Sequence, residues 1–355
     1  MQKKLIALAI ASLSGAAFAQ SNVTIYGAMG LGQESVQATG ATAGAAADVQ
    51  SRGRLASNSS LLGFKGSEKL GNGLTAVFQY ETAFVADTAG ALGGGRDTYL
   101  GLAGGFGTVA AGTLTHPMRV LGAKVDHNPA ASSIGFTGSM YGEFNGLKTG
   151  TDERAGNAIA YISPTISGFH GVFAYVNGEA KTAVVDSSAW QIAGVYDQGP
   201  LFLGMAYHTA EDPAVLGAID SSFKAVRVAG TYTLAGATKL SALWDSQEAK
   251  FKLAGTNAKS TAWMLGAAHT MGANQIYVQY ARANDVTGSA GAVDTGSKQM
   301  TVGFAHSMSK RTTAHAYYSK ITNEAAAGYD FYVNGVGTAA GGDPAGYGVG
   351  LRHSF

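Results

Sequence analysis

The feature that most constrains the fold of this chain is an alternation of apolar with polar or very small residues, repeated along its whole length. In the segment 299–308, for example, Met300, Val302 and Phe304 fall on one side, whereas Thr301 and Gly303 fall on the other. Successive side chains of a β-strand point to opposite faces. Each such segment therefore predicts a strand with one apolar face and one polar or nearly bare face. No segment with a helical period competes with this pattern, and no linker divides the chain.

The connections between these segments are of two kinds that take turns along the chain. Seven are short, and all but the last contain Gly; they lie at residues 69–73, 104–107, 164–168, 198–200, 234–236, 271–274 and 307–310. Eight are longer and polar, near residues 34–53, 86–95, 114–152, 178–188, 211–222, 248–259, 285–297 and 322–344. Together they predict sixteen antiparallel strands, with both chain ends on the side of the short turns. Short turns on one side and long loops on the other are typical of outer-membrane barrels.

A soluble β-sandwich would also show alternation, because it buries its apolar faces against each other. Two observations favour a membrane barrel. Charged residues make up 13% of the chain, about half of the roughly 25% usual in soluble domains. Aromatic residues also gather at predicted strand ends, where barrels carry interfacial girdles; they are Tyr26, Phe84, Tyr161, Phe169, Tyr196, Phe202, Trp244, Tyr280 and Phe355. A closed barrel is the one β-structure that pairs every backbone group in lipid.

The N-terminus has the three-part pattern of a secretory signal. Lys3 and Lys4 precede an apolar run, and the small residues that follow end in Ala17-Phe18-Ala19. We expect residues 1–19 to be a signal peptide that is cleaved between Ala19 and Gln20. Residues 20–355 would then form one all-β domain, a 16-stranded antiparallel transmembrane barrel.

The sequence holds no recognisable catalytic or metal-binding motif. The chain has no cysteine, its eight histidines form no H-E-x-x-H pattern, and neither a G-x-S-x-G elbow nor a phosphate-binding glycine loop occurs. Its 24 basic and 23 acidic residues form no block of one sign, which argues against binding of nucleic acid. We therefore expect no enzymatic activity, no cofactor, no metal and no nucleic-acid partner. An outer-membrane enzyme or adhesin that uses the barrel as an anchor is an open alternative, and the enzyme would use Ser139 and His127, both in the longest loop.

Several segments resemble the trimeric porins of Gram-negative outer membranes, of the β-proteobacterial type. They include QSNVTIYG at residues 20–27, GFKGSEKLGNGLTAVFQYE at 63–81, GRDTYLGLAGGFGTV at 95–109, YISPTISGF at 161–169 and the closing GLRHSF at 350–355. The resemblance covers the chain from residue 20 onward. It implies a homotrimer in the outer membrane, in contact with the lipid bilayer and lipopolysaccharide, that lets ions and small hydrophilic solutes diffuse passively through a water-filled pore.

The resemblance also implies where the pore is narrowest. In the family the third long loop, here residues 114–152, folds into the barrel as a constriction loop, and basic residues line the wall opposite. On this basis the constriction loop contributes Lys124, Asp126 and Glu143. The basic wall contributes Arg96, Arg154 and, as a weaker candidate, Lys65.

Two positions depart from the family pattern. Leu61 and Thr113 stand where the family commonly has basic residues, so the basic wall is thinner than usual. We expect the pore to be weakly selective, with slight preference for anions or none. A substrate-specific channel, with a dedicated binding site in the lumen, is the second alternative that the sequence leaves open. The resemblance further implies that Phe355 is the signal read by the barrel insertion machinery.

Overall fold

A computed structural model describes residues 22–88, 90, 92–129, 133–179, 181–182, 185, 187–213, 216–217, 220–234 and 237–355. The predicted signal peptide, with Ala19 and Gln20, lies outside the described residues. The strands are β1 (Asn22–Thr39), β2 (Val49–Ser57), β3 (Leu61–Gly71), β4 (Leu74–Ala83), β5 (Gly94–Gly104), β6 (Gly107–Thr115), β7 (Glu143–Phe144), β8 (Leu147–Lys148), β9 (Arg154–Ile162), β10 (Phe169–Val176), β11 (Ser188–Gln198), β12 (Leu201–Glu211), β13 (Ser221–Leu234), β14 (Thr238–Phe251), β15 (Thr256–Met271), β16 (Asn274–Ala283), β17 (Ser297–Ser307), β18 (Thr312–Asn323) and β19 (Asp343–Ser354). The helices are the short 3₁₀ turn η2 (Ala45–Ala47) and the α-helices α2 (Pro117–Val125) and α3 (Gly138–Gly142). None of the described helices combines the length and the apolar character that crossing a membrane requires.

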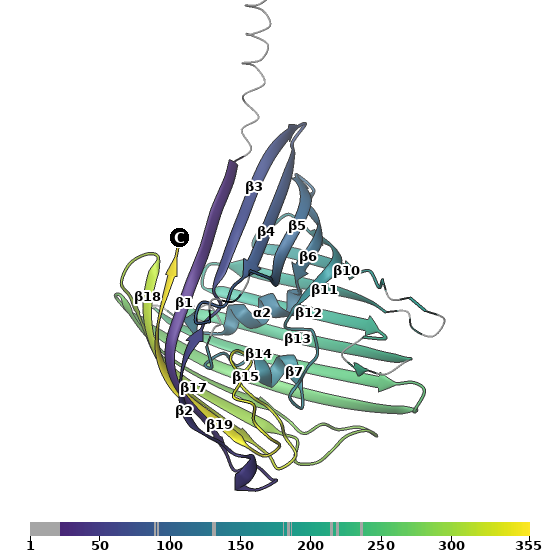
Figure 1. The fold of residues 1–355 in the computed structure, drawn as a ribbon. Coiled ribbons are helices and arrows are strands. Elements are labelled where there is room, and N and C mark those ends of the chain that lie inside the picture. The colour runs from purple at the N-terminus through teal and green to yellow at the C-terminus, as the bar shows by residue number, and fades with distance from the viewer. Residues whose placement is uncertain are drawn as a thin grey trace, which may run out of the picture.

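The strands close into a barrel of tilted antiparallel strands (Figure 1). β1 pairs with β19 on one side, and on the other side its first half pairs with β3 and its second half with β2. β2 and β3 therefore form one wall strand that is interrupted at residues 58–60. The wall counts sixteen strands, as the sequence predicted, while β7 and β8 form a separate small hairpin.

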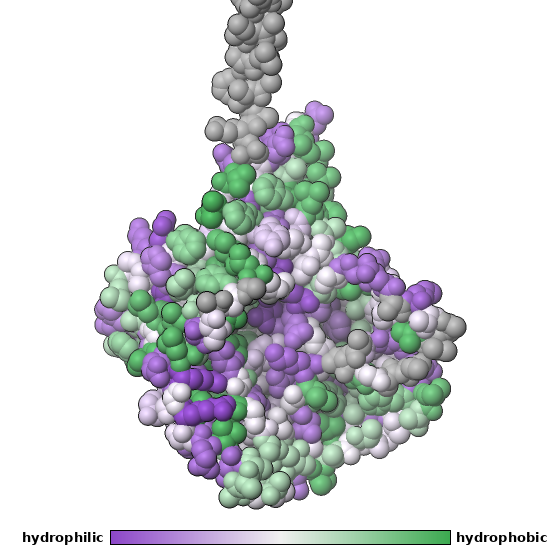
Figure 2. Space-filling model, in the orientation of Figure 1, coloured by the Kyte–Doolittle hydropathy of each residue, from purple (hydrophilic) through white to green (hydrophobic). Residues whose placement is uncertain are grey.

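The alternation along the chain corresponds to the two faces of this wall. Met300, Val302 and Phe304 of β17 are exposed on the outside, whereas Thr301 is fully buried on the inside. Figure 2 shows polar residues gathered in a hollow at the centre of the molecule, with apolar residues over flanking strands. The apolar outer face therefore suits lipid, and the polar inner face suits water. Closure of the strands into a barrel also pairs the backbone groups that lipid could not satisfy.

The seven predicted short turns all join neighbouring antiparallel strands. Two long loops are shorter than predicted: β1 runs on to Thr39, and β14 and β15 leave only residues 252–255 between them. Polar side chains at the outer ends of these strands resemble loop sequence. The buried residues Gln247 and Ala249 nevertheless keep the two-residue period almost to the end of β14.

The aromatic girdle prediction was wrong at two positions. The Tyr26 hydroxyl donates a hydrogen bond of 2.9 Å to the Glu81 carboxylate inside the barrel. Phe202 is buried inside the wall, and its outward neighbour Leu203 is exposed. Both aromatics lie near strand ends, but strand parity turns them inward.

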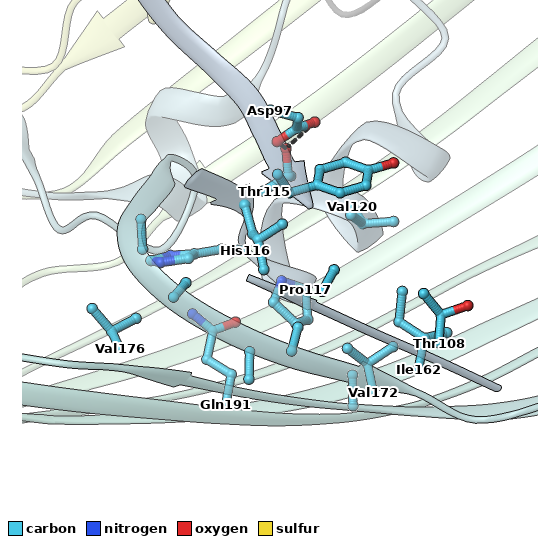
Figure 3. A pocket seen from close by; sticks show the side chains of 18 of the residues that line it. Asp97, Thr108, Thr115, His116, Pro117, Val120, Ile162, Val172, Val176 and Gln191 are labelled. Carbon is cyan, nitrogen blue, oxygen red and sulfur yellow. Dashed lines mark hydrogen bonds between the residues drawn. The ribbon is translucent and has the colours of Figure 1, made fainter. Parts of the chain in front are cut away.

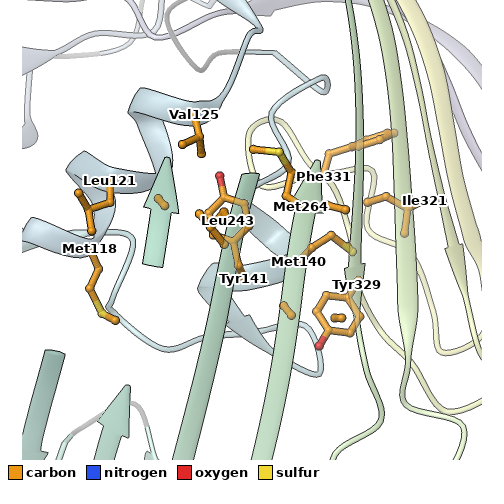
Figure 4. Close-up of a cluster of buried hydrophobic side chains, with 14 of the residues drawn as sticks. Met118, Leu121, Val125, Met140, Tyr141, Leu243, Met264, Ile321, Tyr329 and Phe331 are labelled. Carbon is orange, nitrogen blue, oxygen red and sulfur yellow. The ribbon is translucent and has the colours of Figure 1, made fainter. Parts of the chain in front are cut away.

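The described residues of the segment 116–153, called the inner loop below, lie inside the barrel (Figure 1). β6 continues to Thr115 and β9 begins at Arg154, so these bounds differ little from the predicted 114–152. α2 lies against β11 to β14, and α3 lies against β15 to β17. Apolar side chains of both helices pack on inward-facing Leu243, Met264 and Ile321 and on Tyr329 and Phe331 (Figure 4). The inner loop is thus attached to one side of the lumen, and the opposite wall is left facing it.

Candidate functional site

Helix α2 fits closely against the wall because the wall presents a glycine there. α2 starts with Pro117 at its first position, where the missing N–H costs nothing. The buried side chain of Leu121 points at Gly204 of β12, and a Cβ on Gly204 would lie 2.3 Å from a methyl carbon of Leu121. Such a contact excludes any larger residue unless the Leu121 side chain or the helix shifts. The position of α2 in the lumen is therefore set partly by this glycine.

A buried arginine holds the two ends of the inner loop to the wall. Arg227 of β13 forms ion pairs with Asp152 at 2.7 Å and with Asp245 of β14 at 2.8 Å. Its guanidinium also donates hydrogen bonds to the backbone carbonyls of Met118 and Tyr141, at 2.9 Å and 2.8 Å. All three charged side chains are almost fully buried. Charged groups are buried in this way only when paired, so the pairing ties α2, α3 and the end of the loop to one point.

The two acidic residues that the sequence places in this loop are buried between the loop and other segments. Asp126 accepts hydrogen bonds from the backbone N–H of Asn128 at 2.7 Å and from Gln279 of β16 at 3.3 Å. Burial, only partly offset by these hydrogen bonds, raises the pKa of Asp126 to about 6. Burial also raises the pKa of Glu143 to about 8, although nearby Lys148 acts in the opposite direction. Neither carboxylate presents its charge freely to the lumen.

Lys124, the basic residue predicted in the same loop, has a half-exposed side chain. Its ammonium group lies 3.0 Å from the carboxylate of Asp197 on β11 and 5.4 Å from the centre of the Phe202 ring. These contacts place the C-terminal end of α2 beside the short turn between β11 and β12. Of the three predicted residues of the constriction loop, only Lys124 therefore meets water in the lumen.

The facing wall holds Arg96 through a β-bulge. Between β4 and β5 the pairing shifts from Tyr80 opposite Thr98 to Thr82 opposite Gly95. Glu81 alone then opposes two successive residues, Arg96 and Asp97. A bulge of this kind redirects a side chain toward one face. As a result Arg96 forms an ion pair with Glu81, while Asp97 also points inward.

Arg154 lies next to this pair. Its guanidinium forms an ion pair of 3.1 Å with Asp97, and Asp97 also accepts a hydrogen bond of 2.7 Å from Thr115. The positive charges of Arg96 and Arg119 lie close enough to Arg154 to repel its guanidinium group. The structure thus brings the two strongest predicted basic residues together.

Two arginines at this place were not predicted. Arg119 belongs to α2 and donates to the backbone carbonyl of Asp152. Arg352 of β19 lies close enough to Arg96 for their charges to repel each other, and its Nη1 has no hydrogen-bond partner among the described residues. We call the four arginines and the two acids that pair with them the arginine cluster: Arg96, Arg119, Arg154, Arg352, Glu81 and Asp97. Its formal charge is four positive against two negative, an excess of two positive.

Lys65 lies on the same wall, with its ammonium group 4.9 Å from the centre of the Tyr26 ring. Leu61 and Thr113 lie on β3 and β6 and add no charge there. Alternation along β19 places Arg352 on the face away from the outward-pointing Tyr347 and Val349. This alternation was the one signal by which sequence reasoning could have found Arg352.

The last outer loop, residues 324–342, folds inward over the inner loop. The hydroxyl of Tyr329 accepts a hydrogen bond of 3.1 Å from the backbone N–H of Asn145, and the hydroxyl of Tyr332 donates one of 2.9 Å to the carbonyl of Asp152. The ammonium group of Lys148 lies 4.4 Å from the centre of the Tyr332 ring. The inner loop is therefore held both by the barrel wall and by the last outer loop.

The candidate residues for a barrel-anchored enzyme have separate structural partners. Ser139 is buried on α3 against Gln299, 3.4 Å away. The ring of His127 lies 3.0 Å from the hydroxyl of Ser241 on β14. No group of three residues suited to a metal occurs in the described part of the chain.

Phe355 lies at the seam where the barrel closes. Its backbone N–H donates to the carbonyl of Gly27 at 3.0 Å, and its own carbonyl accepts from the N–H of Gly27 at 3.1 Å. Its ring lies against Gly27, where a Cβ would come within 2.5 Å of the ring. The terminal residue therefore continues the pairing of β19 with β1.

A comparison with models of protein families matches residues 5–326 to the family described as Gram-negative porin. The chain belongs to the Gram-negative porins. The outer membrane porin protein 32 of Delftia acidovorans is 32% identical over the whole of both chains. The major outer membrane protein P.IB of Neisseria gonorrhoeae is 31% identical, covering 88% of this chain and 92% of its own.

Solved structures agree with this assignment. An anion-selective porin from Comamonas acidovorans has a TM-score of 0.81 and 28% identity, covering 95% of this porin and all of that chain. The trimer form of OmpT, an outer membrane protein of Vibrio cholerae, has a TM-score of 0.71 at 16% identity, over 94% of this chain and 99% of its own, which shows likeness of fold. The barrel, its polar interior and the similarity to these porins together show that this porin is a passive channel of the outer membrane.

Proposed function

We propose that this porin forms a homotrimer whose water-filled pores carry small hydrophilic solutes and ions with a slight preference for anions. The narrowest passage in this proposal is the part of the lumen bordered by the inner loop and the arginine cluster. An excess of charge of one sign along a narrow neck favours passage of ions of the opposite sign. The excess of two positive charges in the arginine cluster is the observation that carries the proposed sign.

The ion pairs explain why the preference is slight. Arg96 and Arg154 each face an acid, at Glu81 and Asp97, so part of their field is cancelled locally. Arg119, Arg352 and Lys65 are the basic groups that add to it. Lys124 adds a further positive group on the loop side, next to Asp197.

Asp126 and Glu143 have another role in this proposal. Both carboxylates are buried, and their raised pKa values reflect that burial. We assign them to holding the inner loop in place, so their negative charge weakens anion passage less than an exposed acidic loop would.

The test is the zero-current potential of the purified porin in a planar bilayer under a gradient of KCl. We expect the wild type to show a small potential of the anion-selective sign. Replacing Arg96, Arg154 or Arg352 singly by Gln should shift it toward cation selectivity. Lys252→Gln is the matched control, because it removes one positive charge that is half-exposed and paired with Glu211. The assignment is wrong if the control shifts the potential as far as the cluster variants do.

Trimerisation, export and the assembly role of Phe355 belong to the same proposal. The family resemblance and an outer surface rich in exposed apolar side chains, such as Ile25 and Leu100, support assembly in the membrane and contact with lipid and lipopolysaccharide. The mass of the porin in detergent, measured by light scattering, should correspond to three chains. Amino-terminal analysis of the membrane-derived porin should begin at Gln20, following Ala19.

A further inference from the structure

The lumen contains a side pocket of about 530 Å³ between α2 and the wall strands β6, β9, β10 and β11. Its surface is mostly apolar, unlike the polar interior expected of a diffusion pore. Ile162, Val172, Val176 and Val120 line it, as Figure 3 shows. A cavity of roughly 150 Å³ with such a lining is enough to bind benzene. The pocket therefore has room for a phenyl ring or a branched chain together with a short linker.

One end of the pocket borders the arginine cluster through Asp97. Asp97 and Thr115 form part of its lining, and Asp97 is the carboxylate that pairs with Arg154 at 3.1 Å. Because Asp97 is already paired with Arg154 and with the hydroxyl of Thr115, its negative charge is largely compensated there. A solute in the pocket thus has apolar surface along its body and a net positive field at one end.

The lining of the pocket also includes a buried amide. Gln191 of β11 is 3% exposed and lines the pocket beside His116 (Figure 3). Neither its Nε2 nor its Oε1 has a hydrogen-bond partner within the described part of the chain. Buried amides are normally hydrogen-bonded, so Gln191 offers a free donor and a free acceptor to a solute in the pocket.

We propose that this pocket is a binding site for small organic anions that combine one carboxylate with an apolar body, such as aryl-substituted carboxylic acids. The carboxylate lies at the end lined by Thr115, next to Arg154, which pairs with the lining residue Asp97, and the apolar body lies against Ile162, Val172 and Val176. This inference rests on the proposed function, because the solute reaches the pocket through the pore. It assigns the porin a preferred class of solute beyond general diffusion.

The experiment measures block of ion current through the full-length porin in a planar bilayer. Sodium 3-phenylpropionate, sodium acetate and 3-phenyl-1-propanol are each added to KCl at constant ionic strength. Each buried methylene adds about fourfold in affinity. We therefore expect phenylpropionate to reduce the current saturably, with half-effect at a concentration at least about tenfold below that of acetate. The neutral alcohol should block more weakly than phenylpropionate, because it lacks the charge that meets the arginine cluster.

Two substitutions inside the pocket and one outside test its location. Ala174→Phe fills the pocket from β10 and should abolish saturation, while Val172→Thr keeps the volume but adds a hydroxyl and should weaken block severalfold. Ala242→Phe is the control, since Ala242 is exposed on the outer face of β14 and its variant should block like the wild type. Equal block by phenylpropionate and acetate, equal block by the alcohol, or undiminished block in both pocket variants would each overturn the proposal. The current in KCl alone is recorded first. If that current is normal and block fails, the binding site is wrong, whereas absence of the current itself would mean that the proposed channel function is wrong.

Discussion

Replacing Arg227 by Met should release the inner loop without opening the barrel. The substitution leaves the carboxylates of Asp152 and Asp245 buried and unpaired. Breaking a buried ion pair costs about 3–5 kcal/mol. The variant also loses the hydrogen bonds to the carbonyls of Met118 and Tyr141. Because the wall is held by strand pairing, we expect this cost to fall on the loop.

The size of the cost sets the expected effect. At about 1.4 kcal/mol for each factor of ten, the equilibrium between attached and released loop should shift by roughly a hundredfold to several thousandfold. Trypsin should then cleave after Lys124 and Lys148, which both lie in the inner loop. Cleavage after Lys252, outside that loop, serves as the internal reference. Single-channel records should show increased open-channel noise.

A triple variant separates the effect of leaving two buried carboxylates unpaired from the effect of losing the arginine side chain itself. Arg227→Met combined with Asp152→Asn and Asp245→Asn removes both uncompensated charges, and we expect it to recover much of the resistance to trypsin. If Arg227→Met alone leaves both the digestion pattern and the current noise of the wild type, the idea that Arg227 holds the loop is refuted.

Three further outcomes follow from the same contacts. The pKa values of Glu143 and Asp126 are raised to about 8 and about 6, so attachment of the loop is strongest below the ordinary carboxyl pKa values and weakens as the pH rises toward 8. Open-channel noise should therefore increase over this pH range, and it should increase less in Glu143→Gln. Noise in the wild type that does not depend on pH would contradict this. Gly204→Val should displace α2 because of the 2.3 Å contact with Leu121 and should raise trypsin cleavage after Lys124, an effect that added Leu121→Ala should reduce; equal cleavage with and without Leu121→Ala would argue against the clash. Removing Phe355 deletes both hydrogen bonds to Gly27, so the folded barrel should resist heat less well in semi-native electrophoresis, whereas Phe355→Tyr should behave like the wild type; equal heat resistance on removal would show that the seam does not depend on this residue.

The wall was predictable because lipid and water enforce a strict two-residue period. Met300, Val302 and Phe304 show it in sequence and in structure alike. Glycine, which favours chain reversal, occurs in six of the seven short turns, and the end of the two-residue period marks the seventh, so the strand number and the short turns could be predicted. Interruption of one wall strand at residues 58–60 left the count unchanged.

The interior was harder to predict because its contacts join residues distant in sequence. Arg227 lies in an ordinary strand pattern, and nothing local to it announces Asp152 as its partner. The bulge that turns both Arg96 and Asp97 inward depends on the pairing of β4 with β5, which alternation alone does not reveal. Asp126 and Glu143 look like exposed loop charges until the loop is folded against the wall. Arg352 could have been found, since strand parity already turned it inward.

The most direct test of the central claim, a water-filled barrel wall with a loop attached inside it, is the current recorded when purified porin inserts into a planar bilayer in symmetric KCl. The account predicts discrete steps with a linear dependence on voltage, grouped in threes for a trimer. Folded porin that inserts and carries no current would contradict it.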